Sequence, residues 1–72
     1  MDLDHEKFNL SMRKFLKKVG VTAQQKIEEA VRTGLENGNL SKDELKITVT
    51  LEIKELNLSQ NINGEISLRD ER

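Results

Sequence analysis

The 72-residue sequence contains no cysteine, no proline, no tryptophan and no tyrosine. Without cysteine the chain can form neither a disulfide, nor a thiolate nucleophile, nor a zinc site with cysteine ligands. Without tryptophan and tyrosine it lacks most of the aromatic groups on which single-strand nucleic-acid binders stack bases. Small domains with neither a disulfide nor a metal often gain stability by oligomerising. We therefore expect a homo-oligomer, most simply a dimer.

An excess of charge of one sign is also absent, since 12 basic and 13 acidic residues leave a net charge of −1. This balance gives no global attraction to nucleic acid or to an anionic membrane. The first residues, Met-Asp-Leu-Asp-His-Glu-Lys, have neither the basic region nor the apolar run of a signal peptide. No window has the length of apolar sequence that a membrane span needs. We expect a single small domain, residues 1–72, in the cytoplasm and without membrane contact.

The first half of the sequence has helical periodicity. The apolar residues of its first segment recur at helical spacing: Phe8, Met12, Phe15, Leu16 and Val19. Asp4 suits an N-cap, Lys17 and Lys18 suit a helix C-terminus, and Gly20 suits the left-handed residue that ends a helix. These features predict a first helix at about residues 4–19, with Phe8 and Phe15 in the core.

A second helix is predicted at about residues 23–37. Thr22 and Gln25 have the spacing of a capping box, and Val21 is placed to contact the first turn. The expected buried face consists of Ile27, Ala30, Val31 and Leu35, together with Ala23 and Gly34. Its small residues suggest the close approach of another backbone, because glycine inside a helix otherwise costs up to about 1 kcal/mol. Asn37 and Gly38 end the helix.

In the second half the period becomes two, which predicts an antiparallel β-hairpin with strands at about 45–53 and 56–68. A two-residue turn at Lys54-Glu55 would pair Ile53 with Leu56, although a longer loop over residues 54–61 is the alternative because Lys-Glu is poor turn chemistry. Gly64 marks either a bulge or a close approach of the helices. The predicted fold is α+β, with two N-terminal helices packed on the hairpin. Its exposed sheet edges again favour pairing with a second copy.

The order helix, glycine, helix also occurs in helix-turn-helix DNA readers. The residues that would face DNA are Gln24, Gln25, Glu28, Glu29 and Arg32. The two glutamates would meet phosphates with like charge, and the third helix that such domains need is missing. We favour a capped corner between two helices over a DNA reader.

The first predicted helix has a basic face, and residues 1–20 carry five basic and three acidic residues. This candidate interaction face consists of Lys7, Leu10, Arg13, Lys14, Lys17 and Lys18. Such a face can bind phosphate or an acidic partner, and it can equally be a solvated surface. Leu10 lies among the basic residues and is a candidate anchor for a partner.

The only histidine stands between carboxylates in Asp4-His5-Glu6. Adjacent residues of a helix point in different directions and do not converge on one ion, so we interpret these acids as belonging to a helix start. The four glycines are scattered and form no phosphate-binding loop. We predict no catalytic, cofactor-binding or metal-binding residue, no cofactor, and a protein that is not an enzyme.

Residues 8–31 read F-N-L-S-M-R-K-F-L-K-K-V-G-V-T-A-Q-Q-K-I-E-E-A-V. This segment resembles a family of short bacterial proteins of unknown function with the pattern F-N-x-S-x-R-K-F-L-K-x-V-G-V-T-x-Q-x-x-I-E-x-A-V and a strand-rich second half. Gly64, Glu65, Ile66 and Leu68 resemble the C-terminal end of that family. The resemblance implies a small stand-alone bacterial domain and transfers no site residues. The expected function is a non-enzymatic protein-interaction module, and the alternative is nucleic-acid or polyanion binding through the basic face.

Overall fold

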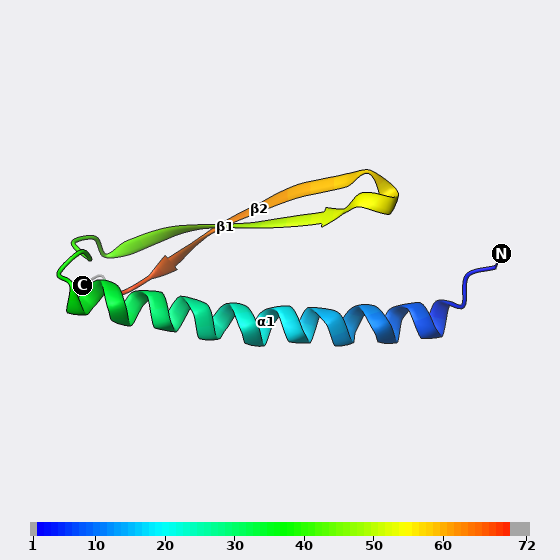
Figure 1. Ribbon diagram of the computed structural model, residues 1–72, viewed down its shortest axis with the longest axis horizontal. Helices are drawn as coiled ribbons and strands as arrows, with labels where there is room; N and C mark the ends of the chain where they lie inside the picture. The colour runs from blue at the N-terminus through cyan, green and yellow to red at the C-terminus, as the bar shows by residue number, and fades with distance from the viewer. Residues whose placement is uncertain (1, 70–72) are drawn as a thin grey trace. The chain divides into compact units, whose positions relative to one another are not determined.

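The computed structural model describes residues 2–69 and confirms the α+β class (Figure 1). Its elements are α1 (His5–Glu36), β1 (Glu44–Ile53), the short 3-10 helix η1 (Lys54–Leu56) and β2 (Leu58–Ser67). The chain divides into two compact units, Met1–Leu40 and Ser41–Arg72. The first unit contains α1 and the second contains the hairpin. The prediction of a single domain over residues 1–72 stays a prediction.

The N-terminus of α1 is capped by Asp4, as predicted. Asp4 has extended backbone angles, and its Oδ1 accepts a hydrogen bond of 3.1 Å from the backbone N–H of Lys7. The Asp4 carbonyl accepts the first backbone bond of the helix, 2.9 Å from the N–H of Phe8. Glu6 lies in the first turn, where a negative charge is favoured by the helix dipole.

The prediction of two helices, 4–19 and 23–37, is wrong because α1 continues through Gly20. Gly20 does not have the positive φ of a helix-ending glycine, and Thr22 and Gln25 lie inside the helix and cap nothing. Glycine inside a helix costs at most about 1 kcal/mol. Ending the helix there would leave up to four C=O groups before the break and up to four N–H groups after it needing new partners. Continuation is therefore the lower-energy outcome.

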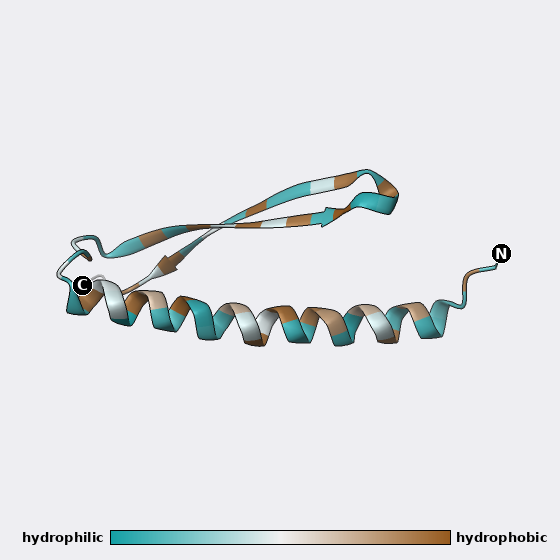
Figure 2. Ribbon diagram, viewed as in Figure 1, coloured by the Kyte–Doolittle hydropathy of each residue, from teal (hydrophilic) through white to brown (hydrophobic). Residues whose placement is uncertain are grey.

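The apolar residues on the two sides of Gly20 are also in phase. Phe8, Val19 and Ala30 are spaced by eleven residues, and so are Met12, Ala23 and Gly34. Eleven residues make slightly more than three whole turns, so these positions lie along one side of a continuous helix. Figure 2 shows apolar residues recurring along the full length of α1. We call this set the apolar stripe: Phe8, Met12, Phe15, Leu16, Val19, Ala23, Ile27, Ala30, Val31 and Gly34.

The C-terminus of α1 is closed at Asn37 and Gly38, as predicted. Gly38 has a φ of +70°, its N–H donates to the Leu35 carbonyl at 3.2 Å, and the N–H of Asn39 donates to the Gly34 carbonyl at 2.8 Å. These two bonds make the Schellman motif, which satisfies carbonyls that the helix leaves free. Leu40 then folds back over Gly34, where its Cγ lies 3.1 Å from the position of an added Cβ. A neighbouring side chain thus fills the space beside this glycine.

β1 and β2 pair antiparallel without interruption, from Glu44 opposite Ser67 to Ile53 opposite Leu58. The strands are confirmed, and odd-numbered residues of β1 face even-numbered residues of β2 as the alternation predicted. Gly64 pairs with Ile47 inside this continuous ladder, so of the two alternatives considered for Gly64 the bulge is not formed. Each strand therefore presents alternate side chains to opposite sides of the sheet.

The connection between the strands is longer than the two-residue turn predicted at Lys54-Glu55. It comprises η1 and Asn57, and Ile53 pairs with Leu58 instead of Leu56. Asn57 has a φ of 52°, and its N–H donates to the Lys54 carbonyl at 3.1 Å. A hairpin turn needs left-handed backbone, which asparagine adopts more readily than lysine or glutamate. The left-handed residue is therefore Asn57.

No side chain among residues 2–69 is buried. The prediction that Phe8 and Phe15 belong to a core is wrong, since they are 48% and 56% exposed. The sheet has only two strands, β1 and β2, so each has an unpaired edge. In this described part of the chain, no helix combines the length and apolarity that crossing a membrane requires.

Candidate functional site

The predicted interaction face lies entirely on α1, within its N-terminal half. All six of its residues are exposed, and Leu10 is the most exposed of the large apolar residues on that helix, at 67%. The ion pairs among residues 2–69 are Lys26–Glu29 and Arg69–Asp43, so the five basic groups of this face have no acidic partner in the described structure. Helical spacing gathers them on one side of α1, Leu10 among them. They are available to an anion or an acidic surface.

The apolar stripe is a second surface on the same helix, and sequence reasoning had assigned it to a core. Its large members are about half exposed: Phe8 48%, Met12 41%, Phe15 56% and Leu16 53%. Lys26 interrupts the stripe eleven residues after Phe15, and its Nζ lies 3.9 Å from Glu29 Oε1. A row of exposed large apolar side chains rimmed by charged ones is typical of a protein-interaction surface.

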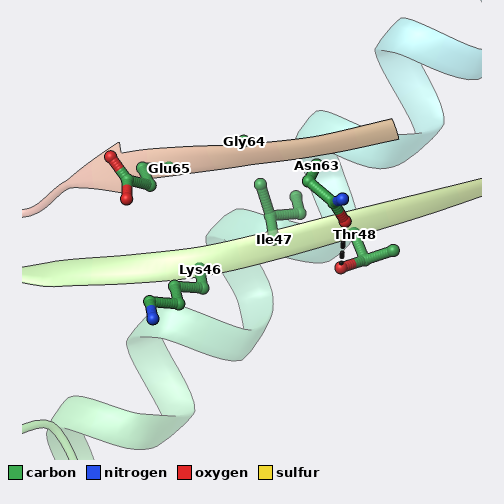
Figure 3. Close-up of a pocket in the computed structure, with 6 residues that line it drawn as sticks. All are labelled: Lys46, Ile47, Thr48, Asn63, Gly64 and Glu65. Atoms are coloured by element: carbon green, nitrogen blue, oxygen red, sulfur yellow. Dashed lines mark hydrogen bonds between the residues drawn. The ribbon is translucent and has the colours of Figure 1, made fainter. Parts of the chain in front are cut away.

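The hairpin has a hollow of about 440 Å³ near its middle, lined by Lys46, Ile47, Thr48, Asn63, Gly64 and Glu65 (Figure 3). Thr48 Oγ1 donates to Asn63 Oδ1 at 2.9 Å, and Thr50 Oγ1 donates to Asn61 Oδ1 at 3.0 Å. These bonds join directly opposed residues and stabilise the strand pairing. All the lining residues except Ile47 are exposed, so the hollow lacks the enclosure of a small-molecule site.

The arrangement required of a helix-turn-helix is not formed. The residues considered for DNA reading, which include Gln24 and Glu28, lie in the middle of α1 with no turn before them. Gln24 Nε2 instead donates to Glu28 Oε2, one turn along, at 3.2 Å. The turn that would present the N-terminus of a recognition helix to a groove is missing.

Asp4, His5 and Glu6 lie at the start of α1, where Asp4 acts as the cap. Among the described residues, no group of three or more histidine, cysteine, aspartate or glutamate side chains is placed to hold a metal ion. The surfaces that remain as candidate sites are the basic face and the apolar stripe.

Residues 3–69 match the family of unknown function DUF6494, and the chain belongs to that family. The resemblance to an uncharacterised family is thereby confirmed over nearly the whole sequence. No curated protein and no solved structure matches the chain.

Proposed function

We propose that this member of an uncharacterised family is a non-enzymatic protein-interaction module of the cytoplasm that works as a homo-oligomer, most simply a dimer. The observation that carries the proposal is the apolar stripe of α1, whose large N-terminal side chains are about half exposed, in a structure whose described residues include no buried side chain. Burial of apolar surface is the main favourable term in folding. A second copy would supply burial that the described residues do not have.

Each unit by itself is of a kind that is marginally stable in water. Most of the stability of a helix in a protein comes from packing its apolar face, and an isolated two-stranded hairpin is marginal at best. α1 has 32 residues and an unpacked row of phenylalanine, methionine and leucine, and the sheet has both edges exposed. Association with a protein partner would stabilise either unit.

Sedimentation equilibrium tests the proposal at two chain concentrations, one of them tens of micromolar, because assembly follows mass action. We expect a mass that rises from 8.3 kDa toward at least twice that value, together with a melting temperature that increases with concentration. A folded protein that stays at 8.3 kDa at both concentrations would contradict self-association.

The basic face supports a second candidate function, the binding of nucleic acid or another polyanion. Its support is the five exposed basic side chains without acidic partners in the described structure. Lys/Arg–phosphate contacts release counterions, so the affinity for labelled DNA or RNA would fall steeply between low and high salt.

Two triple variants with the same loss of charge distinguish binding through the basic face from a general effect of the protein's net charge. One variant replaces Lys14, Lys17 and Lys18 with glutamine, and its control replaces Lys42, Lys46 and Lys54 in the hairpin unit. Both lose three positive charges, so binding through the basic face predicts a loss in the first variant only. Equal losses, or binding that is indifferent to salt, would contradict this candidate.

A further inference from the structure

The charge of α1 reverses along its length. Residues 5–20 carry five basic side chains and one acid, a net charge of +4, whereas residues 21–36 carry two basic side chains and three acids, a net charge of −1. The helix is continuous across this boundary, so both halves belong to one helix surface. A second copy of α1 therefore meets a different electrostatic environment in each orientation.

The reversal occurs on one border of the apolar stripe, where Lys7 and Lys18 are followed at eleven-residue spacing by Glu29. On the other border, Arg13 is followed at the same spacing by the neutral Gln24. A parallel copy would place like charges beside each other at every level, whereas an antiparallel copy places each basic half beside an acidic half. Charges at the border of a paired helix set its orientation in this way.

Side-chain size along the stripe favours the same orientation. The N-terminal half presents Phe8, Met12, Phe15 and Leu16, while the C-terminal half includes Ala23 and Ala30. Antiparallel pairing with Met12 opposite Ala30 also places Val19 opposite Ala23, so that a larger side chain meets a smaller one at both levels, as in well-packed cores. At the other levels Phe15 faces Ile27, and Phe8 faces Gly34, over which Leu40 of the same chain lies.

We propose that the apolar stripe docks against the same stripe of a second copy, with the two helices antiparallel. Met12 then faces the partner's Ala30, and Lys18 and the partner's Glu29 lie on the same border of the contact. This inference rests on the proposed self-association and specifies its surface and orientation. The stripe spans residues 8–34, about 40 Å of helix, and a contact about 10 Å wide buries roughly 400 Å² on each copy, about 800 Å² in total. An area of that size is typical of weak, concentration-dependent association.

The absence of native cysteine allows a direct test by disulfide cross-linking of the full chain. Met12→Cys and Ala30→Cys chains are prepared separately, mixed from denaturant, refolded and oxidised. Because a disulfide needs Cα atoms within about 7 Å, the antiparallel dimer links one chain of each kind. We expect the mixed disulfide as the main product by mass spectrometry, and loss of the link when either variant is oxidised alone. A control mixture of Leu10→Cys with Ala30→Cys stays unlinked, because Leu10 lies away from the stripe.

The other outcomes separate this inference from the proposed function. Efficient linking of Met12→Cys alone would show a parallel pair and overturn the orientation, while self-association would stand. A dimer in sedimentation that gives no link in either experiment would overturn the stripe as the interface. A protein that is folded and monomeric at every concentration would overturn both proposals.

A charge exchange tests the same geometry without cysteine. Lys18→Glu alone and Glu29→Lys alone would each raise the dimer Kd by about fivefold, and the double variant would return it to within about twofold of the original. Residues 18 and 29 are about 17 Å apart along one helix, so such coupling would report on contact between copies. Lys54→Glu, in the hairpin loop, changes charge as much as Lys18→Glu and leaves the Kd unchanged. Independent effects of the two substitutions would contradict the antiparallel pair.

Discussion

At the scale of single residues, three glycines of the helical unit have different roles. Gly20 lies inside α1, where an added Cβ would meet nothing within 4 Å. Gly34 also lies in α1, but an added Cβ would come within 3.1 Å of Leu40 Cγ. Gly38 has a φ of +70°, which a residue with a Cβ adopts only with strain. The same substitution therefore has a different physical cost at each position.

Substitution of each glycine with alanine is expected to separate these roles. Gly20→Ala stabilises by up to about 1 kcal/mol through helix propensity, which raises the melting temperature by about 4–8 °C in a domain of this size. Gly38→Ala destabilises by about 1 kcal/mol or more. The change in stability for Gly34→Ala lies between those of the other two variants, because Leu40 has to move to make room for the added Cβ. Thermal unfolding followed by circular dichroism, at one chain concentration, checks this order. Loss of stability in Gly20→Ala would show that another chain lies against that position.

At the scale of elements, the sequence predicts the strands better than the helix boundary. Alternation along residues 45–53 shows which side of the sheet each residue faces. The pairing of odd-numbered residues of β1 with even-numbered residues of β2 could therefore be predicted. The signals at Gly20 and Thr22 are local and permit a helix end without requiring one. The evidence against a boundary was that apolar residues before and after Gly20 repeat at eleven-residue spacing. This repeat is visible only when the two segments are compared over more than the length of one predicted helix.

The hairpin loop provides a test of turn chemistry at a position that sequence reasoning missed. Asn57 carries the left-handed backbone of the loop, with a φ of 52°. Asn57→Val is expected to destabilise by about 1–2 kcal/mol, because a β-branched residue is strained in this region. Asn57→Gly retains the conformation and serves as the matched control, with an expected change of a few tenths of a kcal/mol. Urea unfolding at fixed protein concentration compares the two. Equal stabilities would contradict the left-handed assignment of Asn57.

At the scale of the whole molecule, sequence periodicity predicts which side of a helix is apolar but not what covers it. Phe8 and Phe15 follow core spacing, yet both remain exposed in the structure. The basic face could be predicted residue by residue, because exposure of Lys and Arg follows from their charge. That the apolar stripe is itself a candidate surface could not be predicted, because the same pattern would arise from packing within one chain.

Two leucines on α1 allow this distinction to be measured with one substitution. Leu16 lies on the apolar stripe and Leu10 on the basic face, and both are exposed, at 53% and 67%. Leu→Asn changes helix propensity equally at both positions, so the difference between the variants isolates the role of the surface. If the stripe is buried by a second copy, Leu16→Asn loses about 1.5–3 kcal/mol per chain, whereas Leu10→Asn changes stability by no more than about 1 kcal/mol. Sedimentation and urea unfolding at matched concentrations measure both effects. The leucine that is more buried in the assembled protein is the one whose replacement costs more stability. A larger loss of stability for Leu10→Asn than for Leu16→Asn would therefore place the partner surface on the basic face.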